Sequence, residues 1–241
     1  MERTSEASPR LLARMTAVFF LLTLLGGVFA QGFVSNRLVV HADALATATN
    51  ILANKNLYQW GFTVYIIEMA CNIATVVLFY ALLKPAGPTV SLVAVALGLA
   101  GCIIKAFSRV FYIAPLFVLG GAHYLSVFTT DQLQALALLL LSVNGQGAGM
   151  ALAFFGFNTF LIGYLMIKST FLPRVLGVLF AISGLGWLTF LSPTLGNSLF
   201  NYISTFALVG AAATLFWFFV FGVNEQRWRE QAGAVGASIR L

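Results

Sequence analysis

Residues 90–113 read VSLVAVALGLAGCIIKAFSRVFYI, an apolar stretch with two charged side chains, Lys105 and Arg109. An α-helix of about 20 mostly apolar residues crosses the roughly 30 Å of hydrocarbon in a bilayer. Five further stretches of the 241-residue chain have this length and character. The sequence therefore predicts an all-α fold, a bundle of six transmembrane helices at about 13–33, 60–83, 90–113, 148–168, 174–192 and 204–223.

The composition agrees with a membrane domain. Hydrophobic residues make up 60% of the chain and charged residues 8%, whereas soluble domains carry about 25% charged residues. So few charges leave most of the outer surface to lipid rather than water. The net charge is +6, but the basic residues are scattered singly, which argues against a nucleic-acid partner. Cys71 and Cys102 both fall in apolar segments and are expected to be buried free thiols.

Lysine and arginine set the expected orientation, because cytoplasmic loops retain them. Their distribution predicts that both termini are cytoplasmic (N-in/C-in), with a cytoplasmic segment 1–12, a membrane domain 13–224 and a disordered cytoplasmic tail 225–241. In this arrangement the outer segments contain Arg37 and Lys55. The cytoplasmic segments contain Arg3, Arg10, Arg14, Lys84, Lys168, Arg174, Arg227, Arg229 and Arg240.

A competing interpretation concerns the first span. Basic residues precede AVFFLLTLLGGVFA at 17–30, and Val28-Phe29-Ala30 resembles a signal-peptidase site. Cleavage there would leave five spans.

Two long outer loops are each expected to contain a short interfacial helix. In the first loop, 34–59, Asp43 is a candidate N-cap. In the second, 114–147, the segment DQLQALALLLLSV is too short to span the membrane and Asp131 is the candidate cap. The glycines that follow predict a turn into the fourth span; they are Gly145, Gly147 and Gly149.

Three ionisable side chains fall at membrane depth, where such groups are expected to face the bundle interior and to have partners. With a rise of 1.5 Å per residue from the outer helix ends, Glu68, Lys105 and Arg109 lie about 13, 12 and 6 Å below the outer boundary. A Glu68–Lys105 ion pair is therefore expected. Asn158 comes to about 15 Å deep by the same count, and Asn72 lies one turn from Glu68 on the same helix face.

These five residues predict a polar cavity that is open to the outer side. Two cations against one carboxylate leave the group positive, and a buried excess cation is costly unless an anion visits it. We therefore expect Glu68, Asn72, Lys105, Arg109 and Asn158 to bind a small or lipid-like anionic ligand without covalent chemistry. The alternative is a sealed ion-pair network in a structural or accessory membrane subunit, whose partner is the lipid bilayer itself.

Catalytic signatures such as HExxH, GxSxG or a phosphate loop do not occur in the sequence. No catalytic residue, metal ligand or cofactor is therefore predicted. One enzymatic alternative remains, a metal-dependent site acting on lipid that is built from His41, Asp43, His123 and Asp131. The sequence gives neither the ligand identity nor the oligomeric state.

Three stretches resemble one protein family. They are RLVVHADALATATNILANKNLYQWG at 37–61, FYALLKP at 79–85 and GFNTFLIGYLMIKSTFLPRVLGVLFAISGLGWL at 156–188. In these stretches the chain is similar to the bacterial membrane proteins catalogued as domain of unknown function 4386. The resemblance implies a multi-span protein of the bacterial inner (plasma) membrane without an agreed activity. It also implies that a histidine often stands at the position of Asn158 and a glycine at that of Ala42, so a role for a titrating imidazole at position 158 is not expected here.

Overall fold

The computed structural model describes residues 8–238, and within them the secondary structure is helical, without strands. The first span consists of α1 (Pro9–Gly27), the π-helix η1 (Val28–Ser35) and α2 (Asn36–Leu38). The elements that follow are α3 (Ala44–Ala53), α4 (Lys55–Leu83), the 3₁₀ turn η2 (Lys84–Ala86), α5 (Pro88–Val118), the turn η3 (His123–Leu125), α6 (Thr130–Lys168), α7 (Arg174–Leu188), the turn η4 (Thr189–Leu191), α8 (Pro193–Val220) and α9 (Glu225–Ser238).

Six helical segments are long and apolar enough to cross a membrane, which confirms the predicted six-span fold. Large apolar side chains remain on their outer faces, as expected of surfaces wetted by lipid. Ile103, Phe107 and Phe216, for example, are 68%, 66% and 62% exposed. The six segments are Pro9–Leu38, Lys55–Ala86, Pro88–Val118, Thr130–Lys168, Arg174–Leu191 and Pro193–Val220.

The fourth span differs from its prediction, because α6 is one continuous helix of 39 residues. The turn expected at the glycines is wrong, and the apolar segment before them is the first part of α6 rather than a separate interfacial helix. A glycine costs a helix only about 1 kcal/mol, and Gly147 has a packing reason to be there, since a Cβ on it would lie 2.7 Å from Cβ of Ser108 on α5. The cap is also not Asp131: Thr129 and Gln132 form a reciprocal capping box at the start of α6.

The short helix predicted in the first loop is present as α3. Asp43 caps it as expected, since its Oδ1 accepts a hydrogen bond of 2.8 Å from the Ala46 amide. The preceding residue, Ala42, has φ +65°, in the left-handed region that favours glycine. An alanine here is strained, in keeping with the glycine that the family resemblance implies for this position.

Replacing Asp43 with alanine is expected to destabilise the protein by about 1 kcal/mol, because the Ala46 amide loses its acceptor. Asp43→Asn keeps an acceptor oxygen and should cost much less. Melting temperatures of the two variants in detergent measure the difference, and equal values would contradict the capping role.

The C-terminal tail also differs from its prediction, since Glu225–Ser238 form α9 rather than a disordered segment. Asn224 accepts a hydrogen bond from the Arg227 amide and so caps the helix. Tertiary contacts then hold it: the Trp228 indole donates to the Leu82 carbonyl at 2.8 Å, and Gln231 accepts from both the amide and the hydroxyl of Thr170. The small, polar composition of the tail gave no sign of these contacts.

The chain forms two compact units. Unit 1 comprises residues up to Leu21, Asn72–Gly101 and the residues from Leu152 onward; unit 2 comprises Leu22–Cys71 and Cys102–Ala151. In unit 1, the rings of four phenylalanines on four helices pack together at centroid distances of 5.9 to 6.2 Å, namely Phe20, Phe79, Phe180 and Phe218.

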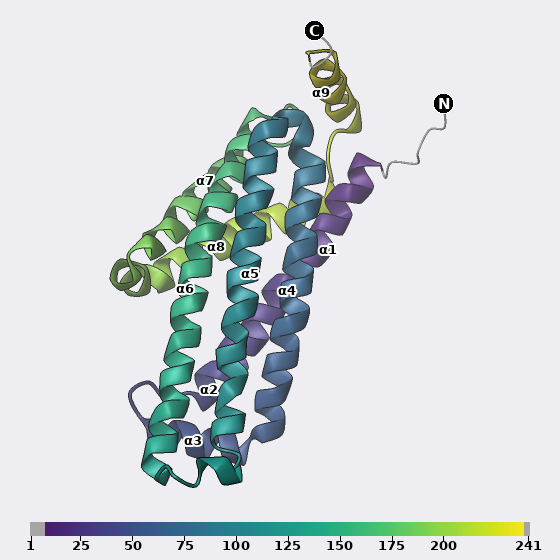
Figure 1. The fold of residues 1–241 in the computed structure, drawn as a ribbon. Helices are drawn as coiled ribbons and strands as arrows, with labels where there is room; N and C mark the ends of the chain where they lie inside the picture. The colour runs from purple at the N-terminus through teal and green to yellow at the C-terminus, as the bar shows by residue number, and fades with distance from the viewer. Residues whose placement is uncertain (1–7, 239–241) are drawn as a thin grey trace. The chain divides into compact units, whose positions relative to one another are not determined.

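Within unit 1, α7 turns back through η4 into α8 (Figure 1), and α7 also packs against α6 at very short range. A Cβ on Gly163 would lie 2.4 Å from the Ala181 nitrogen, and one on Gly184 2.4 Å from the Phe160 nitrogen. Glycine therefore lets the two helix backbones touch, as small residues do between membrane helices.

The core of unit 2 consists of apolar and tyrosine side chains from all of its main helices. Its buried members are Ala30, Val34, Leu38, Ile51, Tyr58, Tyr65, Tyr112 and Leu141. The tyrosines bring hydroxyl groups into this core, and buried hydroxyl groups need hydrogen-bond partners. Their surroundings form the candidate site.

Candidate functional site: a charged polar cluster in unit 2

The predicted ion pair is present in unit 2. Lys105 on α5 donates to Oε1 of Glu68 on α4 at 2.7 Å. The Glu68 side chain is 2% exposed and that of Lys105 17%. A Cβ on Gly26 of the first span would lie 3.0 Å from Cβ of Glu68, so this glycine leaves the room that the carboxylate side chain needs.

Arg109 lies one turn beyond Lys105 on α5 and is 2% exposed. One terminal nitrogen, Nη1, donates to Oδ1 of Asn144 on α6 at 3.0 Å. Its guanidinium carbon lies 3.6 Å from the ring centroid of Tyr65, a close cation–π contact. Within residues 8–238 no carboxylate forms a salt bridge with Arg109.

The π-helix η1 holds the Tyr65 ring in place. The Tyr65 hydroxyl donates to Oε1 of Gln31 at 2.7 Å and lies 3.1 Å from the Ser35 hydroxyl. Ser35 in turn donates to the carbonyl of Ala30, and Gln31 to the Asn36 side chain, each five residues away along the chain. The backbone has the spacing of a π-helix, since the Asn36 amide donates to the Gln31 carbonyl five residues back. Gln31 and Ser35, four residues apart on this helix, both lie at the Tyr65 hydroxyl.

Two further tyrosines lie beside this ring. Tyr58 and Tyr112 stack with centroids 4.5 Å apart, and the Tyr58 hydroxyl donates to the Tyr112 carbonyl. Tyr65 meets Tyr112 edge to face at 5.1 Å. Within residues 8–238 the Tyr112 hydroxyl has no hydrogen-bond partner of ordinary geometry, although the Ser35 hydroxyl lies near it.

We call this group the polar cluster; its members are Gln31, Ser35, Tyr65, Glu68, Lys105, Arg109, Tyr112 and Asn144. One carboxylate and two cations give it a formal charge of +1. Three of its buried polar atoms have no partner among the described residues: Oε2 of Glu68, Nε of Arg109 and the hydroxyl of Tyr112. A buried polar atom without a partner costs free energy. A ligand with one hydrogen-bond acceptor, for Arg109 and Tyr112, and one donor, for Glu68, would satisfy these atoms.

The remaining two predicted site residues belong to unit 1. Asn158 donates to the Ala94 carbonyl at 2.7 Å and is buried, while Asn72 is half-buried. Because α6 begins at Thr130 rather than near residue 148, the depth assigned to Asn158 is wrong. Counted back from the α6 end at Lys168, Asn158 lies about 15 Å along the helix and Asn144 about 36 Å.

Asn144 is one of the site residues that sequence reasoning missed, because it lay in a predicted loop. Its usable signal was the apolar stretch before the glycines, which continues the helical pattern of the fourth span. Four further members of the cluster were not predicted as site residues, because their contacts lie between helices and do not follow from any one helix alone; they are Gln31, Ser35, Tyr65 and Tyr112.

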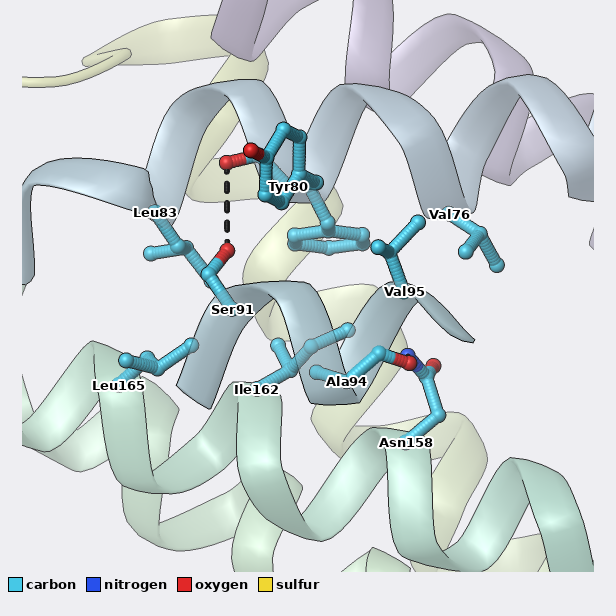
Figure 2. Close-up of a pocket in the computed structure, with 10 residues that line it drawn as sticks. Val76, Tyr80, Leu83, Ser91, Ala94, Val95, Asn158, Ile162 and Leu165 are labelled. Atoms are coloured by element: carbon cyan, nitrogen blue, oxygen red, sulfur yellow. Dashed lines mark hydrogen bonds between the residues drawn. The ribbon is translucent and has the colours of Figure 1, made fainter. Parts of the chain in front are cut away.

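Asn158 instead lines a narrow gap in unit 1 (Figure 2). The gap has an empty volume of about 170 Å³, is too tight for a water molecule and is walled mainly by apolar side chains. Ser91 donates to the Tyr80 carbonyl at its edge. A Cβ on Gly98 would lie 2.9 Å from Nδ2 of Asn158, so the amide packs against bare backbone. These contacts give Asn158 a role in helix packing.

The metal-dependent alternative is not supported by the geometry. Across residues 8–238, no three histidine, cysteine, aspartate or glutamate side chains lie close enough together to hold a metal ion. His41, Asp43, His123 and Asp131 therefore do not form a shared site. Among the described residues, Cys71 and Cys102 are buried and are not joined in a disulfide, as predicted.

Comparison with known proteins identifies a family. The model of a family described as Domain of unknown function (DUF4386) matches residues 15–223. No curated protein and no solved structure gives a significant match.

Proposed function

From its membership of the DUF4386 family and its six membrane-spanning helices, we propose that the chain is a multi-pass membrane protein that binds an anionic group, a small anion or a lipid phosphate, at the polar cluster. Binding is non-covalent and no cofactor is involved. The observation that carries the proposal is Arg109, a buried cation without a carboxylate partner among the described residues.

The energetic argument starts from the cost of burying charge. The penalty in real proteins is several kcal/mol per ion unless a counter-charge offsets it. Lys105 already takes the charge of Glu68 at 2.7 Å. The Tyr65 ring and the Asn144 amide solvate Arg109 without neutralising it. A bound anion would complete the charge balance.

The helix lengths suggest where this anion comes from. We place both termini in the cytoplasm, so that Lys84 and Pro88 mark the inner boundary of the hydrocarbon. Along α4, Glu68 then lies about 24 Å from Lys84, and along α5, Arg109 lies about 31 Å from Pro88. Because the hydrocarbon is about 30 Å thick, Arg109 lies at the outer boundary and Glu68 about 6 Å inside it, shallower than the 13 Å counted from the outer end of the predicted helix. Phosphate groups of lipids and dissolved anions both reach that level.

Arg109→Met is expected to abolish retention of an anionic ligand by the purified protein, because it removes the uncompensated charge and keeps the apolar stem. The measurement is native mass spectrometry of the full chain from mild detergent, comparing the mass of retained adducts. Arg37→Gln is the matched control: Arg37 is an exposed cation of the same unit outside the cluster, and its loss should leave the adduct unchanged. The proposal is refuted if wild-type protein carries no anionic adduct, or if Arg109→Met retains it.

A second candidate function follows from the degree of burial. Glu68 and Arg109 are each 2% exposed, and the contacts of the cluster connect four helical segments of unit 2. Such a network fits a structural or accessory subunit that uses the charges to fix helix registry. It predicts that wild-type protein carries no ligand and that Arg109→Met lowers its melting temperature.

A further inference from the structure

The three unpartnered atoms of the polar cluster specify more than negative charge. We propose that the ligand is an anionic phosphodiester that also carries hydroxyl groups, the chemistry of a phosphoglycerol headgroup. This inference rests on the proposed function of the cluster. It is drawn from the kind of hydrogen bond that each unpartnered atom can make.

The three atoms belong to residues that are grouped with Tyr65. Arg109 and Tyr112 lie three residues apart on one face of α5, and both contact the Tyr65 ring, at 3.6 Å and 5.1 Å. Glu68 follows Tyr65 by three residues on α4, again on the same face. All three residues are at least 98% buried. One ligand group lodged beside Tyr65 is therefore within reach of all of them.

Two of the three atoms call for a phosphate. The Nε–H of Arg109 is a donor, and the Tyr112 hydroxyl can donate as well. Guanidinium groups bind phosphate oxygens through strong charge-assisted hydrogen bonds. A phosphate oxygen would thus satisfy both atoms and neutralise Arg109.

The third atom calls for a donor on the same ligand. Oε2 of Glu68 has no partner, and an ionised carboxylate can only accept. A bare phosphodiester without hydroxyl groups would leave this atom unsatisfied and would add a like charge beside it. A hydroxyl or ammonium group attached to the phosphate removes the problem.

Charge balance selects between these two donors. The cluster carries +1, so a phosphoglycerol group, with charge −1 and free hydroxyls, brings the site to zero. A phosphoethanolamine group has a donor but no net charge, and it leaves the cation uncompensated. A phosphocholine group has neither net charge nor a hydrogen-bond donor. Phosphoglycerol therefore matches the site in both respects.

Exposure shows where such a group enters. Gln31 is exposed and Lys105 is 17% exposed, whereas Glu68 and Arg109 are closed off. Ile103 and Phe107 lie two residues to either side of Lys105 and therefore face the opposite side of α5, so the exposed parts of Gln31 and Lys105 mark the opening. A lipid headgroup can therefore reach the polar cluster at these two side chains.

The test is lipid competition on the full-length protein in detergent, read by native mass spectrometry. Phosphatidylglycerol, phosphatidylethanolamine and phosphatidylcholine with identical acyl chains are offered at equal concentration. We expect phosphatidylglycerol to be retained at least about tenfold over the other two, a factor that corresponds to 1.4 kcal/mol. Soluble glycerophosphoglycerol and inorganic phosphate are offered separately as competitors. Displacement by glycerophosphoglycerol shows that a water-soluble source of the same chemistry suffices, whereas no displacement assigns the site to lipid.

Tyr112→Phe isolates the headgroup contact, because it removes one oxygen that has no protein partner. We expect it to weaken phosphatidylglycerol retention about tenfold while leaving the melting temperature unchanged or higher. Tyr58→Phe is the matched control: its hydroxyl donates to the Tyr112 carbonyl, so this variant should lose stability and keep the lipid preference.

The outcomes separate the two proposals. Equal binding of the three lipids that still depends on Arg109, or an unchanged preference in Tyr112→Phe, overturns the phosphoglycerol assignment and leaves anion binding in place. Absence of any lipid or anion that depends on Arg109 overturns both.

Discussion

Gly163→Ala is expected to destabilise the protein by about 3 kcal/mol or more, the upper range of overpacking costs. The new Cβ would lie 2.4 Å from the Ala181 nitrogen and 2.7 Å from the Gly177 carbonyl oxygen. Both are backbone atoms, so no side chain can rotate away and α6 and α7 must separate. The measurement is the melting temperature in detergent, together with the yield of monodisperse protein on size-exclusion chromatography.

Gly145→Ala is the control on the same helix. A Cβ there meets nothing within 4 Å, so the substitution should gain up to about 1 kcal/mol from helix propensity. Gly163→Ala is thus expected to lower the stability and Gly145→Ala to raise it. A similar effect at both positions would show that the contact between α6 and α7 is not as close as described.

Glu68→Gln has the second large expected effect, a loss of about 3–5 kcal/mol, which is typical when one partner of a buried ion pair is removed. The variant leaves the cations of Lys105 and Arg109 without the carboxylate of the cluster. The double variant Glu68→Gln with Lys105→Met should recover most of the loss, because it removes the pair as a whole. Reversible unfolding in mixed micelles gives the free energies for a double-mutant cycle.

The cycle has a simple control in Lys55→Met, which removes an exposed cation from the first turn of α4 and should change stability by less than about 0.5 kcal/mol. Additive effects of the two cluster substitutions would mean that the ion pair contributes no coupling energy. The interpretation of Glu68 as an ionised, paired carboxylate would then be wrong.

The spans and the ion pair could be predicted because each depends on local pattern. Six apolar stretches of sufficient length define the helices. Glu68 and Lys105 occur on consecutive spans at comparable distances from the helix ends, so their pairing followed from the 1.5 Å rise alone. Asp43 predicted the start of α3, because aspartate is a common N-cap residue.

The rest depended on contacts between distant segments. Gly147 predicts a turn when taken alone, and its place in a continuous α6 becomes clear only beside Ser108 on the neighbouring helix. That error hid Asn144 and misplaced Asn158. The order of α9 depends on Trp228 and Gln231 reaching Leu82 and Thr170, which no feature of the tail sequence reveals.

The π-helix of the first span also affects how its sequence should be compared with others. In an α-helix, residues five apart point about 140° away from each other, yet the Asn36 amide here donates to the carbonyl of Gln31, five residues back. A helical wheel drawn with an unbroken 3.6-residue repeat therefore assigns the residues after Ser35 to the wrong face of the helix. A homologue with one residue fewer between Val28 and Ser35 would form an ordinary α-helix here, with the residues on either side still facing the same way. A one-residue gap at this point of an alignment would therefore leave the packing of the first span unchanged.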